Sequence, residues 1–284
     1  MRKDTIDLIF QVAKKKDAFD SLEKHLSTIS RLDLFNNFIE CGVIPEVFSQ
    51  NSSEEKLWAK FSDIFLSHAL NFIGIKSEVL GARGNSADVL GRTENYTIVG
   101  DAKTFRLSRT AKNQKDFKIT ALDTWRKQNN YALLVAPLLQ YPTRSSQIYT
   151  QAITRNVTLL SYTHLLLLLK FHKNQNLITL WETGNRLNID SNNSLQSSIE
   201  YWNEIDKTIC KILCQDDEKL KEFKRLEIEK TKDLGNEGIL YWQNKMLSYD
   251  NLTQKEVVKL LIKAEKIESK IKTIKRAIST KVIL

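Results

Sequence analysis

Glycine, proline and cysteine are scarce in this sequence of 284 residues, which holds 9 glycines, 3 prolines and 3 cysteines. An all-β chain needs many turns built from glycine and proline, so their shortage favours a fold rich in helices. Three cysteines are too few for a disulfide framework, and their number is odd. The cysteine content therefore indicates a reducing compartment, and we expect a cytoplasmic protein.

Long apolar runs are also missing. The first residues, Met1 to Asp7, lack the apolar stretch of a signal peptide. The most apolar run, Leu165 to Leu169, is closed by His164 and Lys170 and is too short to span a bilayer. We therefore expect a soluble protein with no membrane partner.

Apolar and basic residues are both plentiful. Hydrophobic residues make up 42% of the chain, which is enough for a sizeable buried core. The formal net charge is +9, and a basic excess attracts polyanions such as nucleic acids through phosphate contacts and counterion release. Because many basic proteins bind no nucleic acid, the positions of the basic residues have to show whether this chain does.

Three regions with different patterns follow one another. Residues 1–77 carry apolar residues at helical spacing, and Ser52 with Glu55 three residues later predicts a capping box at the start of a helix. Residues 78–190 alternate short β-type runs with helical patterns, and residues 191–284 return to helical spacing. We predict an α/β fold with a mixed central sheet flanked by helices, in a single domain over residues 1–284 with helical N- and C-terminal parts.

Four runs rich in β-forming residues are the predicted strands: Asp88–Leu90, Tyr96–Val99, Tyr131–Val135 and Val157–Leu160. Asp88 opens the first strand, and Asp101 ends the second. If these strands are antiparallel neighbours, both carboxylates lie at the same edge of the sheet. Asp101 and Lys103 are two residues apart, so on a strand their side chains point to the same face.

Two carboxylates and a lysine at one sheet edge suit the hydrolysis of a phosphodiester. A hard cation such as Mg²⁺, held by carboxylate oxygens, polarises the phosphate and lowers the pKa of water. A neighbouring lysine can orient that water. The pattern Asp…Asp-x-Lys is the signature of the PD-(D/E)XK nucleases. By itself the pattern is weak, because Asp-x-Lys also occurs by chance as an exposed salt bridge at a strand end.

A basic stretch follows Lys103 directly, and Asp116 is the only acidic residue up to Lys118. Basic runs are usually solvated faces, but this one adjoins the carboxylates, where a DNA backbone would lie during cutting. Its basic and amide side chains therefore predict DNA contacts. The candidates are Arg106, Arg109 and Lys112 for phosphates, Asn113 and Gln114 for an adenine edge, and Lys115 for guanine O6 and N7.

The segment Asp101–Lys118 closely resembles the active-site segment of the HindIII family of type II restriction endonucleases. The resemblance extends over nearly the whole chain. Further similar segments are Glu55–Leu57, Arg83–Asn85, Ala136 to Ile148 and the C-terminal helices. The resemblance implies a fold of the PD-(D/E)XK nuclease type. It also implies a metal site at Asp88 and Asp101, joined in our interpretation by the Ala102 carbonyl, with Lys103 as the catalytic lysine.

The family also implies what the protein acts on. We expect a Mg²⁺-dependent homodimer that cuts double-stranded DNA at the palindrome AAGCTT after the first adenine and leaves 5′-phosphate ends, because a two-fold protein mirrors a palindromic site. A cognate DNA methyltransferase is the implied functional partner, without a stable complex. Glu55 could approach the metal or serve only as a capping residue, and Asp116 could orient Lys115.

Two departures from the family leave other interpretations open. Gly81 stands where the family carries a glutamate, and the loop between Asp88 and Asp101 is shorter. A sequence-specific DNA-binding protein that has lost catalysis is one alternative. A nuclease of the same fold with another specificity is the other.

Overall fold

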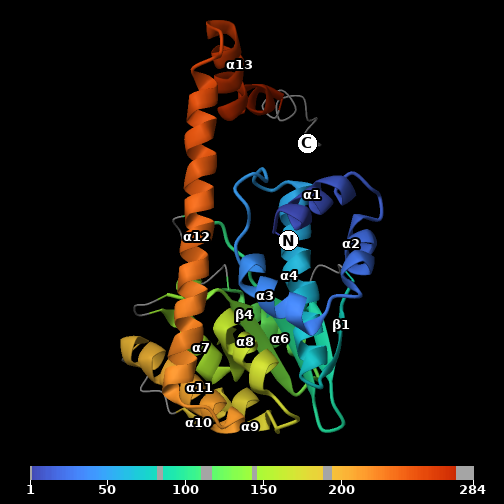
Figure 1. Ribbon diagram of the computed structural model, residues 1–284, viewed down its shortest axis with the longest axis vertical. Helices are drawn as coiled ribbons and strands as arrows, with labels where there is room; N and C mark the ends of the chain where they lie inside the picture. Colours follow the sequence, from blue (N-terminus) through green and yellow to red (C-terminus); the bar gives the residue numbers. More distant parts are fainter. Residues whose placement is uncertain (1, 82–85, 110–116, 143–145, 188–193, 273–284) are drawn as a thin grey trace, which may run out of the picture. The chain divides into compact units, whose positions relative to one another are not determined.

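The computed structural model describes residues 2–81, 86–109, 117–142, 146–187 and 194–272 (Figure 1). The chain divides into two compact units, Met1–Gly238 and Ile239–Leu284. The first unit contains the whole β-sheet, and the division falls inside the helical C-terminal region predicted from residue 191 onward. The two units are therefore described separately.

A five-stranded mixed sheet in the order β1-β2-β3-β4-β5 forms the centre of the first unit. The pairs β1–β2 and β2–β3 are antiparallel, whereas β3–β4 and β4–β5 are parallel. The strands are β1 (Lys76–Val79), β2 (Val89–Arg92), β3 (Thr97–Ala102), β4 (Tyr131–Ala136) and β5 (Val157–Ser161). The predicted fold class is confirmed. Of the strands in the described residues, the sequence analysis missed β1, a short edge strand whose sequence, Lys-Ser-Glu-Val, is mostly polar.

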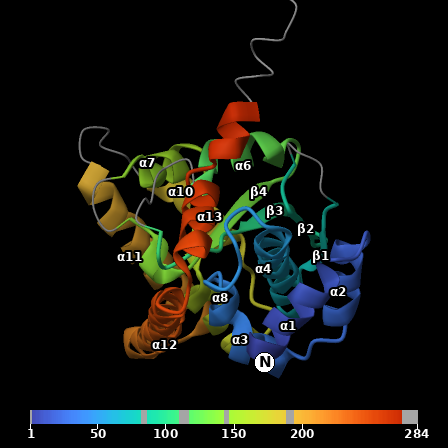
Figure 2. The ribbon, with the colours of Figure 1, turned by 90° about the horizontal axis from the view of Figure 1, so that it is seen from above.

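Helices cover both faces of the sheet (Figure 2). On one face, α6 (Ile119–Arg126) and α7 (Gln147–Thr154) contact β3, β4 and β5. On the other face lie α4 (Ser53–Phe72) and α8 (Tyr162–Phe171), with α4 against β1, β2 and β3. Because β4 and β5 are covered on both sides, almost every one of their residues is buried, which explains their nearly continuous apolar sequences.

Helix α4 begins where the sequence predicts it. The Ser52 hydroxyl accepts a hydrogen bond from the Glu55 N–H at 3.2 Å. The second half of the predicted capping box is different, because the Glu55 carboxylate accepts from the Asn51 N–H instead of from Ser52. The helix then runs between the sheet and the N-terminal helices, so most of its circumference is buried.

The remaining helices complete the two units. The first unit also contains α1 (Arg2–Val12), α2 (Ala18–Leu26), α3 (Arg31–Cys41), the short 3₁₀ turn η1 (Leu138–Gln140), α9 (Ile178–Trp181), α10 (Thr183–Arg186) and α11 (Ser194–Leu213). Helix α12 (Asp217–Tyr249) crosses the boundary at Gly238, and α13 (Gln254–Ala264) belongs to the second unit. Among the described residues, no helix combines the length and the apolar character that crossing a membrane requires.

Candidate metal centre and DNA-contacting segment

Strand register brings the two predicted carboxylates together. Val89 of β2 pairs with Gly100 of β3 in antiparallel fashion. Extending this register by one residue sets Asp88 opposite Asp101, and directly opposed side chains on antiparallel strands lie within contact distance. The convergence expected from the sequence is therefore produced by the hairpin of β2 and β3.

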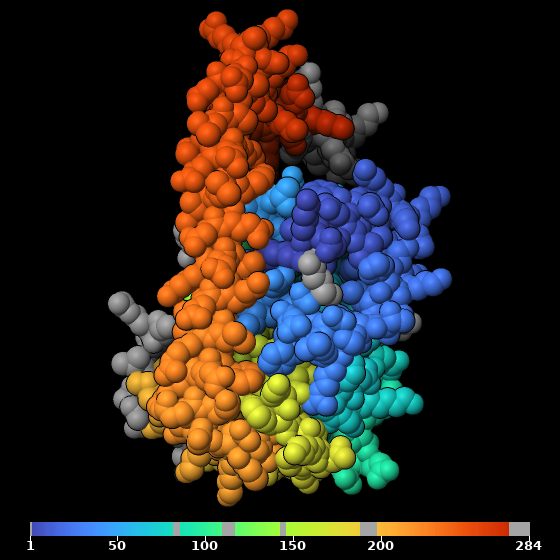
Figure 3. Space-filling model, in the orientation of Figure 1, coloured from blue at the N-terminus to red at the C-terminus, as the bar shows by residue number. Residues whose placement is uncertain are grey.

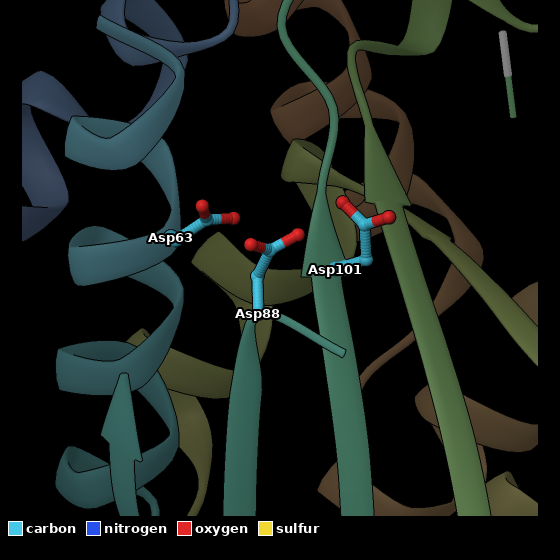
Figure 4. A group of neighbouring side chains, drawn as sticks. All are labelled: Asp63, Asp88 and Asp101. Atoms are coloured by element: carbon cyan, nitrogen blue, oxygen red, sulfur yellow. The ribbon is translucent and has the colours of Figure 1, made fainter. Parts of the chain in front are cut away.

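A third carboxylate, from helix α4, completes the cluster. Asp63, Asp88 and Asp101 each offer a carboxylate oxygen, and these oxygens lie within 4.8 Å of one another. Figure 4 shows the three side chains pointing toward one another from α4, from the start of β2 and from β3. Asp63 and Asp101 are buried, whereas Asp88 is partly exposed and opens the cluster toward solvent.

Two lysines lie against these aspartates. The Lys103 ammonium is paired with Asp101, in agreement with their predicted common face. The Lys60 ammonium is paired with Asp88 and also lies 3.4 Å from Oδ2 of Asp63. The negative charge of the cluster is thus partly balanced by two protein cations.

The electrostatics of Asp63 show a site that lacks positive charge. Burial raises the pKa of Asp63 well above its ordinary value, and the carboxylates of Asp88 and Asp101 raise it further, while Lys60 and Lys103 only partly oppose this. Burial alone would lower the pKa of Lys60, but Asp63 and Asp88 outweigh that effect and raise it. Three crowded carboxylates with hard oxygen donors are the set that a divalent cation such as Mg²⁺ prefers. The residues present therefore fit such an ion.

Ala102 contacts the cluster through its backbone. Its N–H donates a hydrogen bond to Oδ1 of Asp63 at 3.4 Å, and its carbonyl accepts one from the Ser62 hydroxyl at 3.3 Å. The carbonyl predicted to bind the metal thus already has one hydrogen-bond donor from α4. A carbonyl oxygen has two lone pairs, so this bond still leaves one for a cation.

The sequence analysis did not identify Asp63. It considered Glu55 on the same helix either as a carboxylate near the metal or as a capping residue, and the Glu55 carboxylate is held by Arg106 at 2.8 Å and does not belong to the cluster. A signal for Asp63 does exist in the sequence. It is the charged residue within the run Phe61–Leu66, which is otherwise apolar except for Ser62. A carboxylate inside a helix that is apolar around its circumference has to be buried, and a buried carboxylate needs a cation or hydrogen-bond donors.

The start of the basic stretch is fixed to the N-terminal part of the chain. The Phe105 N–H donates to the Gly42 carbonyl at 3.0 Å, and the Ile44 N–H donates to the Phe105 carbonyl at 3.0 Å. One step earlier, the Tyr162 hydroxyl donates to the Lys103 carbonyl at 3.1 Å. These bonds hold the chain where it leaves β3 for the segment predicted to contact DNA.

Arg106 lies in a different environment from the one expected of a phosphate contact. Its side chain is 12% exposed, and its guanidinium pairs with Glu55 and lies 3.7 Å from Glu46. It also donates to the carbonyls of Pro45 and Phe48. In this structure Arg106 therefore joins the basic stretch to the loop before α4 and to the helix itself.

The remaining predicted DNA contacts can be placed only in part. Arg109 lies at the described end of the segment and has an interaction within the chain. Lys112, Asn113, Gln114, Lys115 and Asp116 fall outside the described residues, as does Arg83–Asn85. Gly81 is exposed, and a side chain added there would meet no atom within 4 Å. The described residues around Gly81 therefore leave room for the glutamate that the sequence analysis expected of the family.

Two comparisons with known proteins bear on this site. The family model described as HindIII restriction endonuclease matches residues 10–278, a span that includes the three aspartates and the basic stretch. The type II restriction enzyme HindIII of Haemophilus influenzae is 34% identical over 264 residues, which cover 91% of this chain and 88% of that enzyme.

Proposed function

The chain belongs to the HindIII family of restriction endonucleases, and on that premise we propose that it hydrolyses double-stranded DNA at the palindrome AAGCTT, after the first adenine. The observation that carries the catalytic part of this proposal is the convergence of Asp63, Asp88 and Asp101 beside Lys103. The recognition sequence and the position of the cut follow from the family and from the resemblance of the segment Asp101–Lys118.

Mg²⁺ is the proposed cofactor. Asp88 and Asp101, with the Ala102 carbonyl, are the proposed ligands, and Asp63 is a further carboxylate within reach of the same ion. When bound, the ion supplies Lewis-acid polarisation of the phosphate and a lower pKa for water. Burial of Asp63 and Asp101 keeps bulk water away from two of the three oxygens and strengthens their electrostatic interactions.

The protein's own groups have distinct parts in the proposed reaction. Lys103 is paired with Asp101, so it can orient the attacking water and stabilise charge that develops on the phosphate. The water gives up a proton to solvent and its oxygen forms a bond to phosphorus, while the bond to the 3′ oxygen breaks in line and that oxygen takes up a proton from solvent. The products are a 5′-phosphate and a 3′-hydroxyl end.

Recognition is proposed for the segment that follows Lys103. Arg109 and Lys112 would contact phosphates, while Asn113, Gln114 and Lys115 would read base edges. Arg106 is better placed to hold this segment than to bind DNA, because two glutamates already pair with it. The proposed unit of function is a cytoplasmic homodimer that works with a cognate DNA methyltransferase.

Digestion of a DNA of known sequence, followed by sequencing of the fragment ends, tests the proposal. Discrete fragments with ends at A^AGCTT and 5′ overhangs are expected with Mg²⁺. Discrete fragments with other ends would replace the proposed specificity, and a gel shift on AAGCTT without cutting would identify a DNA-binding protein that has lost catalysis.

Asp101→Asn tests the proposed site. It should abolish cutting and leave DNA binding in Ca²⁺ intact, whereas Asp123→Asn, an aspartate of α6 paired with Arg126 and Arg155, should leave cutting unchanged. Retained cutting by Asp101→Asn would overturn the assignment of the metal centre.

A further inference from the structure

The C-terminal unit has an unusual distribution of apolar side chains. None of its described residues, 239–272, is buried, so this part of the unit has no core. Its large apolar side chains are instead exposed. Figure 3 draws this unit in orange to red. They are Ile239, Leu240, Trp242, Met246, Leu247 and Tyr249 on α12, Val257, Val258, Leu260, Leu261 and Ile262 on α13, and Ile267 and Ile271 beyond it.

The end of α12 after Gly238 and α13 have no core of their own in the described residues, and such helices are not expected to be stable in water. Helix α13 has 11 residues, and isolated helices of this length are marginal even with favourable sequences. A capping box at Thr253 and Glu256 starts the helix, but it contributes only about 1 kcal/mol. The apolar side chains must therefore be covered by something else when the unit is folded.

The size of the apolar surface indicates the kind of partner. Side chains of this size, each about half exposed, together present roughly 1,000 Å². One protomer of a stable dimer contributes about 800 Å² to its interface, and monomeric proteins rarely expose an apolar patch this large. The described part of the first unit offers no comparable set, since its exposed large apolar residues are scattered: Leu32, Val47, Leu139, Ile199 and Leu226.

The apolar character of this surface favours a second protein surface over DNA. Residues 239–272 carry charges of both signs, seven lysines and four acidic residues. A DNA-contacting surface is basic and polar, whereas this one combines its basic excess with many large exposed apolar side chains. Mixed charges at the rim of an apolar surface are typical of protein interfaces.

We infer that residues 239–272 form the dimerisation surface and that their partner is a second copy of this chain. The inference rests on the proposed function, because a palindrome is cut on both strands by two protomers related by a two-fold axis. In such an arrangement the same surface takes part on both copies. The exposed apolar side chains of residues 239–272 are then covered in the dimer.

The test compares the full-length chain with a double variant in sedimentation velocity. Leu247→Glu with Leu261→Glu places charges at side chains that are 63% and 61% exposed in the single chain, so folding of the first unit should not change. The dimer of the variant should be at least about 100-fold weaker than that of the wild type. The matched control is Leu32→Glu, which changes a side chain that is 68% exposed in the first unit and should remain dimeric.

Each other outcome has a definite meaning. A double variant as dimeric as the wild type would overturn the inference and leave the proposed nuclease intact. A wild type that is monomeric at every concentration would remove both the surface and the proposed homodimer. Binding of the wild type, but not of the double variant, to phosphatidylcholine–phosphatidylserine vesicles, with unchanged dimerisation, would assign the surface to a membrane instead. Failure of digestion leaves the sedimentation result valid, because sedimentation does not depend on cutting.

Discussion

The Nζ of Lys60 lies 3.4 Å from Oδ2 of Asp63, one turn further along α4, and the same ammonium is paired with Asp88. A lysine thus lies where three carboxylates could hold a divalent cation. In the protein without metal, Lys60 acts as a counterion for two of the three aspartates. This relationship has consequences for stability and for metal binding.

Lys60→Met should destabilise the metal-free protein and increase the stabilisation that Ca²⁺ provides. Loss of the ammonium leaves Asp63 and Asp88 without a charged hydrogen-bond donor, which costs about 1–3 kcal/mol. Ca²⁺ no longer competes with a protein cation for these oxygens. Thermal unfolding in EDTA and in Ca²⁺ measures both effects. Lys56→Met, at an exposed lysine of the same helix, should show neither, and a Ca²⁺ response equal to that of the wild type would contradict the counterion role.

Asp63→Asn should lower kcat by about 100-fold or more, since one carboxylate of the proposed metal site is lost. It should also stabilise the metal-free protein. The pKa of Asp63 is raised by burial and by its neighbouring carboxylates, so its ionised form is less favourable in the folded than in the unfolded protein. Asparagine has no charge and retains the oxygen that accepts from the Ala102 N–H.

Single-turnover cutting and thermal unfolding in EDTA test this pair of effects. Glu55→Gln is the control on the same helix, and it should leave the rate of the chemical step unchanged. Full activity of Asp63→Asn would exclude Asp63 from the metal site. Lower stability in EDTA would show that its charge is compensated.

Glu46→Gln distinguishes an anchored segment from a simple phosphate contact. Glu46 accepts hydrogen bonds from the Ser108 N–H at 3.3 Å and from the Ser108 hydroxyl at 2.9 Å, and it lies 3.7 Å from Arg106. If electrostatics alone governed DNA binding, removal of a negative charge would strengthen it. We expect weaker specific binding, because the basic stretch loses its support.

Fluorescence anisotropy with AAGCTT and scrambled duplexes in Ca²⁺ provides the measurement. The affinity for AAGCTT should fall by about 10-fold, while the affinity for the scrambled duplex should change little. Glu94→Gln, an exposed residue in the turn between β2 and β3, is the matched control. Equal tightening on both duplexes would assign Glu46 a purely electrostatic effect.

His164 should make the protein less stable as the pH falls. Its Nδ1 accepts from the Ser161 N–H at 3.0 Å, so its Nε2–H donates to Asp206 at 2.9 Å. Burial lowers the pKa of His164 below 6.5, although Asp206 partly opposes this. The folded state thus disfavours the proton that the unfolded state binds. The neutral His164 side chain therefore contributes to the free energy of unfolding above pH 6.5, and this contribution is lost as the pH falls through the lowered pKa of His164.

Urea unfolding between neutral and mildly acidic pH measures this dependence. His164→Gln should give a smaller loss of unfolding free energy over that range, whatever its stability at neutral pH. His25→Gln, at an exposed histidine of α2, should keep the wild-type dependence. An unchanged slope in His164→Gln would exclude this histidine as the source.

The sequence predicted the features that follow from the regular geometry of helices and strands. The apolar runs of β4 and β5 and the spacing of Asp88, Asp101 and Lys103 follow from strand geometry, which a sequence displays directly. Asp63 was missed because its partners lie on strands that are distant in sequence. Periodicity identified α4 but could not show which side of a mostly buried helix faces the strand ends.

Arg106 illustrates a second limit. A basic residue beside an active centre looks the same in sequence whether it binds phosphate or pairs with the protein's own carboxylates. Glu46 and Glu55 precede it by many residues, and tertiary contacts such as the bonds of Phe105 to Gly42 and Ile44 bring them to it. The described residues of the C-terminal unit, 239–272, are mostly helical as predicted, but helical spacing does not tell whether an apolar stripe faces a core or another molecule.

The hydrogen bond from the Ala102 amide to Asp63 has a consequence for the order in which the elements of the protein unfold. This amide lies at the end of a central strand, and its acceptor stands on a helix that packs between the sheet and the N-terminal helices. Separating the two groups requires α4 to leave the sheet. Exchange of this amide with solvent deuterium should therefore proceed only through complete unfolding of the first unit, and heat should end cutting in the same step that melts the core.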